Sequence, residues 1–212
     1  MKRMVGAAIA IAVLFLSACA AVEPSVTGSV AVAKADAGKP VDGGIVYLLR
    51  GGFNVFSTGM DELAVKLRAR GFNARAEGHA VWPQLAAEAR QRYARSKAPI
   101  VIIGHSWGAL AAILMAFELE KSGTPVALMI LYDTTESAKI PRNVRHVVNF
   151  SSPSEKTLGA TVTGAFGFSG KIDTVDVSSF GHFSLDNAPP LHEASIAEVM
   201  KVIRPDSRAA GQ

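Results

Sequence analysis

The chain has one cysteine, Cys19, in 212 residues, so it cannot form an internal disulfide bond. A cysteine-based metal site is excluded for the same reason. The five histidines show no His-x-x-x-His or comparable ligand spacing. The sequence therefore predicts neither a metal site nor another cofactor.

Charge is also sparse. Charged residues make up 19% of the chain and hydrophobic residues 49%, a balance typical of a folded globular protein. The formal net charge is +4, of which Lys2 and Arg3 supply two units. The other basic residues are scattered among acidic ones, which indicates a solvated surface and not the basic stripe of a nucleic-acid-binding protein. The length is sufficient for one domain with a sizeable core.

The first twenty residues have the pattern of an export signal. Lys2 and Arg3 form a positive region, and the apolar run 6–16 is too short to span a bilayer comfortably. Residues 16–19, Leu-Ser-Ala-Cys, resemble the bacterial lipobox, in which the cysteine is lipidated and becomes the first mature residue. The resemblance implies a signal peptide over 1–18 and a lipid anchor on Cys19. The alternative is an ordinary signal peptide with an incidental cysteine.

The anchor predicts a location in the bacterial cell envelope, because several acyl chains hold a protein at a bilayer where one chain would not. Ala20 follows the cysteine, where the enteric retention signal has an aspartate, so the outer membrane is favoured over the inner. Residues 19–42 are rich in Ala, Val, Gly and Ser, and we interpret them as the lipidated N-terminus and a flexible tether. A strand over 26–33 is an alternative for part of it.

From residue 43 onward, apolar runs alternate with helical patterns. Continuous apolar runs are typical of parallel strands buried on both faces, whereas the alternating run 72–77 indicates a sheet edge. We expect the spatial strand order 72–77, 44–49, 99–103, 126–132, 144–150, 172–177. Helices are expected between most of these strands and after Pro189 or Pro190, and residues 151–170 are expected to form a loop.

This pattern predicts an α/β fold over residues 43–206, with a mostly parallel sheet of about six strands and helices on both faces. Residues 207–212 are interpreted as a disordered tail.

The stretch Gly104–Gly108, of sequence Gly-His-Ser-Trp-Gly, lies between an apolar run and a helical run. Gly-x-Ser-x-Gly matches also occur by chance, but a strand before and a helix after the match favour a sharp turn that exposes Ser106 as a nucleophile. Larger residues at Gly104 or Gly108 would crowd such a turn. The helix N-terminus would direct free N–H groups at the site, where negative charge develops.

Three chemically suitable residues follow strand ends in chain order: Ser106, Asp133 and His182. Ligands of open α/β sheets bind outside the carboxyl ends of strands, so all three are expected to face one crevice. This order is that of the α/β-hydrolase family, which the chain resembles over about residues 43–205. The resemblance rests on Gly104–Gly108, the Arg-Gly-Gly turn at 50–52 and the Gly-His pair that ends at His182. It is strongest to compact bacterial hydrolases with thioesterase-like or lipase-like cores.

The resemblance implies roles for these residues. Ser106 would attack a carbonyl carbon, and His182 would accept the serine proton and return it to the leaving group. The backbone N–H of Trp107 would be one oxyanion donor, and that of Gly52 or Phe53 the other.

A third residue, an acid that orients His182, would complete a catalytic triad with Ser106, and the sequence leaves its identity open. The common family position follows strand 144–150, where the chain has no aspartate and Glu155 is the nearest acid. A minority arrangement places the acid one strand earlier, where Asp133 is, and Asp133 is therefore preferred. The remaining alternatives are Asp173, Asp176 and Asp186. The other histidines fit the role of His182 less well because none follows the final strand; they are His79, His105, His146 and His192.

The sequence thus predicts a serine hydrolase that cleaves a small-molecule or lipid-like carboxylic ester or thioester and is held at a membrane by its lipid anchor. No insertion long enough for a substantial lid follows Asp133, so the crevice is expected to be open and shallow. The alternative is a non-catalytic envelope lipoprotein that uses the hydrolase scaffold to bind a ligand or partner.

Overall fold

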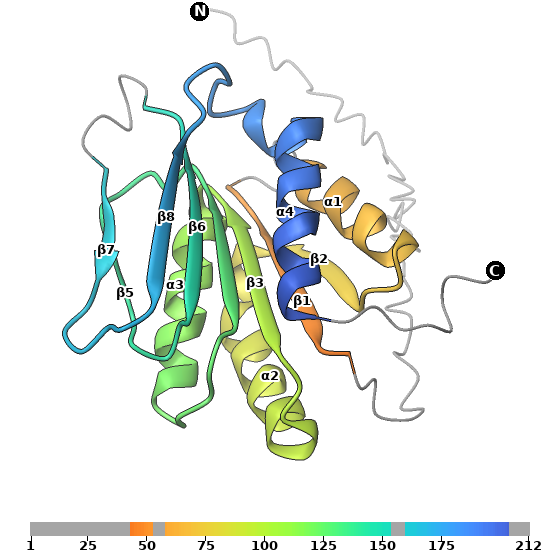
Figure 1. The fold of residues 1–212 in the computed structure, drawn as a ribbon, viewed down its shortest axis with the longest axis vertical. Coiled ribbons are helices and arrows are strands. Elements are labelled where there is room, and N and C mark those ends of the chain that lie inside the picture. Colours follow the sequence, from red (N-terminus) through yellow and green to blue (C-terminus); the bar gives the residue numbers. More distant parts are fainter. Residues whose placement is uncertain (1–42, 53–57, 154–159, 204–212) are drawn as a thin grey trace, which may run out of the picture. The chain divides into compact units, whose positions relative to one another are not determined.

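The computed structural model describes residues 43–52, 58–153 and 160–203. They contain a six-stranded sheet in the order β2-β1-β3-β4-β6-β8 (Figure 1). All of its strand pairs are parallel, and the order is the predicted one. The strands are β1 (Ile45–Arg50), β2 (Ala74–Gly78), β3 (Ile100–His105), β4 (Leu128–Tyr132), β6 (His146–Ser151) and β8 (Lys171–Asp176).

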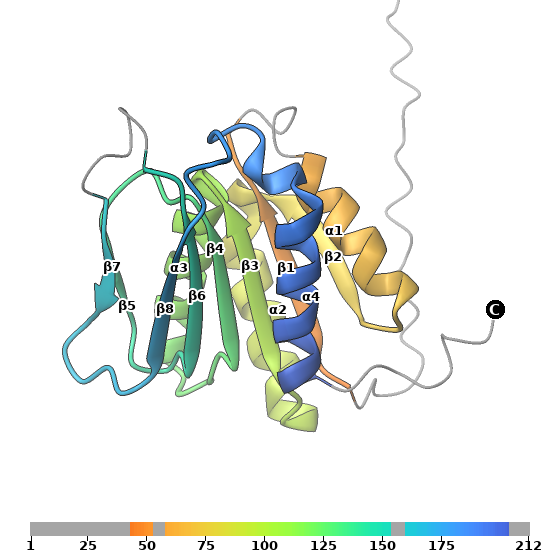
Figure 2. The ribbon, with the colours of Figure 1, turned by 45° about the horizontal axis from the view of Figure 1, so that its top comes forward.

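Two helices cover each face of the sheet. Figure 2 shows α1 (Thr58–Ala69) and α4 (Pro189–Val202) on one face, and α2 (Trp82–Ser96) and α3 (Trp107–Glu120) on the other. The predicted α/β class is therefore confirmed. Side chains of the central strands alternate between two cores, so that Tyr47 and Leu49 pack toward α2 and α3 while Leu48 packs toward α1 and α4.

The burial of each strand follows its sequence. The apolar strands β3 and β4 are buried along their whole length, because they are flanked by other strands and covered on both faces. The strand β2 lies at an edge with only its first residue fully buried, as its polar alternation predicts. Among the described strands, none pairs with the outer side of β2.

Two helix starts also follow local rules. Proline stands in the first turn of α2 and of α4, where its missing N–H costs no helical hydrogen bond. In α3 the small residues Ala109, Ala111 and Ala112 are buried, so the helix can approach the sheet closely.

A second, two-stranded parallel sheet pairs β5 (Ala138–Ile140) with β7 (Val162–Gly164). The strand β7 corrects the prediction of a loop over 151–170. Both strands have only three residues and carry polar side chains, so neither gives a recognisable apolar run. They form because Ile140 and Val162 are buried in the core beside α3.

Several sequence interpretations fall outside the described residues: the signal peptide 1–18, Cys19, the tether 19–42, the alternative strand 26–33, Phe53, Glu155 and the tail 207–212. Among the residues that are described, no helix has both the length and the apolar character needed to cross a membrane.

Candidate active site

Ser106 lies in a strained turn between β3 and α3. It precedes the first residue of α3 and has φ 56° and ψ −120°. A positive φ in a residue with a Cβ costs on the order of 1–3 kcal/mol and persists only where its surroundings fix it. Here the Ser106 N–H donates to Tyr132 O over 3.0 Å, and the Ser106 carbonyl accepts from Ala109 N–H over 2.9 Å. The turn places Ser106 at the carboxyl edge of the sheet. The residue is only 8% exposed, so the prediction that the turn exposes the serine to solvent is corrected.

Two glycines make this turn possible. A Cβ on Gly104 would lie 2.2 Å from the carbonyl oxygen of Gly108, and a Cβ on Gly108 would lie 2.0 Å from that of Leu49. Both distances are far inside van der Waals contact. The prediction that larger residues would crowd the turn is confirmed.

A hydrogen-bonded series joins Ser106, His182 and Asp133. His182 Nδ1 lies 2.6 Å from Asp133 Oδ2, and His182 Nε2 lies 3.0 Å from Ser106 Oγ. A carboxylate oxygen accepts, so Nδ1 carries the proton and Nε2 presents its lone pair to the serine hydroxyl. The expected contact of these three side chains is therefore present, with each following a different strand.

Asp133 is held rigidly for this contact. It is 2% exposed and has φ 49°, a conformation that aspartate tolerates better than most residues. Its N–H donates to Phe150 O over 2.8 Å, and its Oδ1 accepts from Ser152 N–H over 3.0 Å. One carboxylate oxygen therefore fixes the side chain to the end of β6, and the other serves His182.

The other described carboxylates considered for this role are engaged elsewhere. Asp173 Oδ2 lies 2.9 Å from His146 Nε2, and Asp176 Oδ1 accepts from Ser178 N–H over 2.8 Å. Asp186 belongs to a buried cluster described below. In the described parts of the chain, no group of three or more His, Cys, Asp or Glu side chains is arranged to hold a metal ion.

The predicted oxyanion donors Trp107 and Gly52 lie side by side. A Cβ on Gly52 would stand 3.0 Å from Trp107 Cε3, so the indole packs directly on the glycine backbone. Trp107 is the first residue of α3, and N–H groups in the first turn of a helix have no partner within that helix. The positive end of the helix dipole adds to their attraction for an oxyanion.

Arg50 fixes the oxyanion loop, which we define as residues 50–52, and sequence reasoning missed this role. The Arg50 guanidinium makes two hydrogen bonds of 2.7 and 2.5 Å with the Asp61 carboxylate of α1. It also donates to Ala76 O of β2 over 3.2 Å. The sequence does show Asp61 in the first turn of the helix that follows Arg50. It does not show that the two side chains form an ion pair.

His79 supports the same loop from the end of β2. Its Nδ1 donates to Gly51 O over 3.2 Å. The His79 ring also meets the Trp107 indole edge to face, with ring centroids 5.6 Å apart. Because this contact joins residues from separate elements, no local pattern in the sequence indicates it. The loop that carries Gly52 is thus held from two sides.

Two aromatic side chains lie beside the triad and reach solvent. Trp107 follows the serine and is 49% exposed, and Phe183 follows the histidine and is 66% exposed. The Phe183 ring packs edge to face on the His182 ring, with centroids 5.1 Å apart. The segment 134–145 after Asp133 contains β5 and no helix, as expected for a chain without a lid insertion there.

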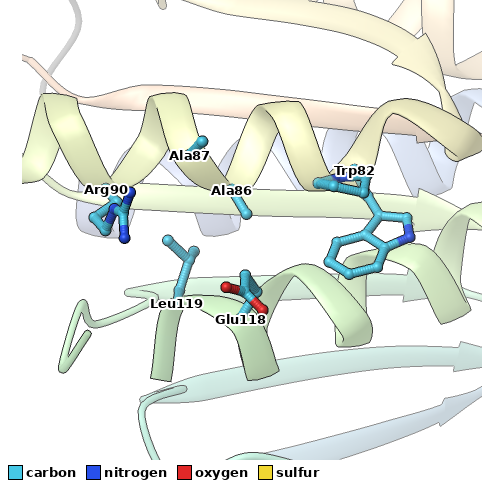
Figure 3. Close-up of a pocket in the computed structure, with 7 residues that line it drawn as sticks. Trp82, Ala86, Ala87, Arg90, Glu118 and Leu119 are labelled. Carbon is cyan, nitrogen blue, oxygen red and sulfur yellow. The ribbon is translucent and has the colours of Figure 1, made fainter. Parts of the chain in front are cut away.

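A separate cavity of about 310 Å³ lies between α2 and α3, with Trp82 toward one end and Arg90 toward the other (Figure 3). Its lining includes Glu118, twelve residues beyond Ser106 along α3 and so about 18 Å away along the helix axis. No serine, cysteine or histidine lines it. The cavity therefore lacks the candidate nucleophile and base, Ser106 and His182.

Comparison with known proteins finds a likeness to solved structures at low sequence identity. No family model matches the chain, and no curated protein matches it. A candidate hydrolase of the α/β superfamily from Xanthomonas campestris pv. campestris has 18% identity and a TM-score of 0.45, covering 75% of this chain and 98% of that one. Human thioesterase 2 has 14% identity and a TM-score of 0.45, with 74% and 97% coverage. The Vlm2 thioesterase domain has 13% identity and a TM-score of 0.46, with 77% and 94% coverage. Such values do not assign a family, so the chemistry must follow from the side chains.

Proposed function

We propose that the protein is a serine hydrolase that cleaves a carboxylic ester or thioester through an acyl-enzyme on Ser106. One observation carries this proposal: the series from Ser106 Oγ through the His182 ring to Asp133, with contacts of 3.0 and 2.6 Å. Such a series is the arrangement that activates a serine hydroxyl by an adjacent base oriented by a third group.

In the acylation step, Ser106 Oγ forms a bond to the substrate carbonyl carbon while its proton passes to His182 Nε2. Asp133 stabilises the imidazolium that results. The carbonyl oxygen becomes an oxyanion and accepts from the N–H groups of Trp107 and Gly52, each worth roughly 3 kcal/mol in the transition state. The bond to the leaving group then breaks, and His182 returns the proton to the departing alcohol or thiol.

In the deacylation step, water replaces the alcohol or thiol. His182 Nε2 takes a proton from the water as its oxygen attacks the acyl carbon. The second tetrahedral intermediate uses the same oxyanion donors. Its collapse breaks the bond to Ser106 Oγ, which regains a proton from His182, and a carboxylic acid leaves.

The surroundings of the triad support an apolar substrate. The exposed rings of Trp107 and Phe183 flank Ser106 and His182. The nearby cation Arg50 is engaged by the Asp61 carboxylate. A neutral small-molecule or lipid-like ester or thioester suits these groups better than a substrate with a negative charge beside the reacting bond.

We also propose that the enzyme acts in a bacterial envelope, anchored through Cys19 and favouring the outer membrane. The support is the sequence of residues 2–20 alone, with its basic pair, short apolar run and lipobox-like ending. The contact between the Asp133 carboxylate and His182 supports the catalytic proposal over the alternative of a non-catalytic binding lipoprotein, whereas the 8% exposure of Ser106 does not.

The test is active-site labelling of the purified domain with a fluorophosphonate probe, which reacts with an activated serine. We expect one label per chain, located by peptide mass spectrometry on Ser106. Hydrolysis of p-nitrophenyl butyrate should be lost together with the label in Ser106→Ala. The matched control is Ser122→Ala, a serine near the end of α3, which should leave both unchanged. Equal hydrolysis by wild type and Ser106→Ala would overturn the proposal.

A further inference from the structure

A cluster of buried polar side chains lies behind the loop that carries His182. It combines His105 of β3, Asp186 of the short helix η2 (Leu185–Asn187), and His192 with Ser195 of α4. Each of these residues is 2% exposed or less. Burying titratable groups of this kind costs folding free energy unless they are paired. The reaction proposed for Ser106, His182 and Asp133 does not use them.

His105 connects the cluster to the catalytic histidine. Its Nε2 lies 2.9 Å from His182 O, and a carbonyl oxygen only accepts, so Nε2 carries the proton. The other ring nitrogen, Nδ1, faces Asp186 Oδ2 at 3.8 Å. The rings of His105 and His182 are neighbours, with centroids 5.1 Å apart. His105 therefore holds the main chain of His182 on one side and faces Asp186 on the other.

Asp186 joins the His182 loop to α1. Its Oδ2 accepts from Gly59 N–H over 3.2 Å, in the first turn of that helix. A Cβ on Gly59 would lie 2.0 Å from Asp186 O, so the two backbones touch. Asp186 O in turn accepts from His192 Nε2 over 2.5 Å. Asp186, four positions after His182, thus joins η2 to α1 and to α4.

The charge of Asp186 is not neutralised by a described cation. Among the described residues, no lysine or arginine lies within ion-pair distance of its carboxylate, whose one close partner of opposite potential charge is His105. Burial raises the pKa of Asp186 to about 6 and lowers the pKa of His105 to about 4. Near neutral pH, an ionised carboxylate is therefore buried beside an uncharged imidazole, an arrangement that weakens the fold.

We propose that Asp186 is a positioning residue of the active site, retained because its negative charge favours the imidazolium of His182 while it fixes the His182 loop through His105 and α1. The inference rests on the proposed serine hydrolase reaction, in which His182 becomes positively charged in both steps. A protonated His182 lowers the pKa of Asp186, so the two groups attract each other when His182 carries the proton. Asp133 contacts the ring directly, and Asp186 adds a second negative charge on the far side of His105.

The other groups packed around Asp186 do not supply this charge. Burial lowers the pKa of His192, which donates to Asp186 O and accepts from Lys66 Nζ of α1 over 3.0 Å. Lys66 is also paired with Glu62 on the same helix. On β4, burial raises the pKa of Tyr132, so its hydroxyl keeps its proton. His105 and His192 are neutral near pH 7. Asp186 is therefore the anion of the cluster, connected to His182 through the His105 ring.

The test compares Asp186→Asn with wild type in melting temperature and in kcat/KM for p-nitrophenyl butyrate from pH 5 to 8. Asparagine has nearly the same shape and can still accept from Gly59 N–H, but it carries no charge. We expect the variant to melt at a higher temperature at pH 7.5 and to lose roughly ten-fold in kcat/KM there. The pH profile of kcat/KM for the variant should lack the change near pH 6 at which Asp186 ionises. The matched control, Asp173→Asn on β8, neutralises a more exposed carboxylate and should change neither quantity.

A merely structural role gives a different result. If the negative charge of Asp186 only strengthened the contacts that hold the loop, Asp186→Asn would lower the melting temperature and the activity together, and the inference would be wrong. It would also be wrong if the variant kept the wild-type kcat/KM across the pH range. A second pair checks the connection through His105: His105→Gln, which keeps a donor, should retain more kcat than His105→Phe, which has none.

The proposed function can fail separately from this inference. A wild-type protein that takes no fluorophosphonate label on Ser106 would remove the reaction, and the role of Asp186 with it. A labelled wild type whose Asp186→Asn variant is equally active would overturn the role of Asp186 alone.

Discussion

His182 Nδ1 contacts Asp133 Oδ2 at 2.6 Å although the two residues are separated by 49 positions and follow strands that are not neighbours. The strand β6 lies between β4 and β8. The loop after β8 crosses the end of β6, where Val177 N–H donates to Ser151 O over 2.8 Å and Ser152 Oγ donates to Phe180 O. This crossing brings His182 to the end of β4. The carboxylate of Asp133, which follows β4, can therefore accept a hydrogen bond from the His182 ring.

The first prediction concerns Asp133→Asn. The amide can turn its NH₂ group toward His182 Nδ1, which then becomes an acceptor, so that Nε2 carries the proton and no longer accepts from Ser106. We expect kcat to fall by roughly 10⁴-fold with little change in KM. Steady-state hydrolysis of p-nitrophenyl butyrate measures this, and circular dichroism checks that the variant is folded. Asp176→Asn, at the end of β8, is the control and should remain active. A Asp133→Asn variant within ten-fold of wild type would show that another acid serves His182.

The second prediction compares two glycines at the ends of α3. A Cβ on Gly108 would lie 2.0 Å from Leu49 O, whereas a Cβ on Gly123 would meet nothing within 4 Å and would suffer only from its φ of +64°. Gly123→Ala should therefore cost on the order of 1–2 kcal/mol of unfolding free energy. Gly108→Ala should cost more or prevent folding, because main chain must move. Urea unfolding of both variants gives the comparison, and equal losses would contradict the close approach of α3 and β1.

The fold was predictable to the extent that single elements carry their own signals. The runs that became β1, β3 and β4 are apolar throughout, and the alternation of β2 correctly indicated an edge. The short strand β7 was missed because its formation depends on pairing with β5, which lies more than twenty residues away. A pattern confined to three residues cannot report such a partner.

The residues of the candidate site also differ in whether the local sequence indicates them. Ser106 is indicated by its own turn sequence, and Asp133 and His182 by their places after strands. The roles of Arg50 and His79 in the oxyanion loop arise from contacts with Asp61 and Gly51, which are set by packing between elements. The sequence offered Asp186 only as one of several acids, since burial cannot be read from a single residue.

The third prediction concerns stability and pH. The pKa of Asp186 is raised from 3.8 to about 6 in the folded protein. A raised carboxyl pKa means that the fold binds this proton more tightly than the unfolded chain. The stability from this group is therefore complete below pH 3.8 and is lost as the pH rises to about 6. A difference of about two pKa units corresponds to an effect on the order of 3 kcal/mol.

Urea unfolding of wild type and Asp186→Asn at a series of pH values measures this effect. The variant should gain on wild type as the pH rises through the window from 3.8 to about 6, and the difference should stay constant above it. A difference that is independent of pH between 4 and 7 would show that the Asp186 carboxyl titrates normally in the fold.

The fourth prediction concerns the anchor. Cys19 is the single cysteine and follows Leu-Ser-Ala, so its replacement removes the one sulfur that could be lipidated. Cys19→Ser should leave the protein unprocessed or release it from membranes, whereas the adjacent control Ala20→Ser should remain membrane-bound. Membrane fractionation and intact-mass measurement of the mature protein give the answer. A mature N-terminus that is unmodified at Ala20 or beyond would instead identify a secreted enzyme.

The last prediction concerns Phe183 and follows from the order of the two chemical steps. In the proposed reaction His182 lies beside the leaving-group atom in order to protonate it, and the Phe183 ring packs on the His182 ring with centroids 5.1 Å apart. Phe183 is 66% exposed, so its ring offers apolar surface to an alcohol or thiol above His182. The leaving group departs at acylation, and the acyl-enzyme that remains is the same for every ester of one acid.

Phe183→Ala should therefore weaken acylation without changing deacylation. We expect kcat/KM for a p-nitrophenyl or hexyl butyrate to fall roughly ten-fold, as the loss of an apolar ring contact implies, while ethyl butyrate changes little. The deacylation rate constant, measured after a burst with p-nitrophenyl butyrate, should equal that of wild type. Met200→Ala removes another exposed apolar side chain, from α4, that is 56% exposed, and it should affect neither step. A Phe183→Ala variant that slows deacylation as much as acylation would show that Phe183 supports the His182 ring itself, because Phe183 packs on that ring and the ring takes part in both steps.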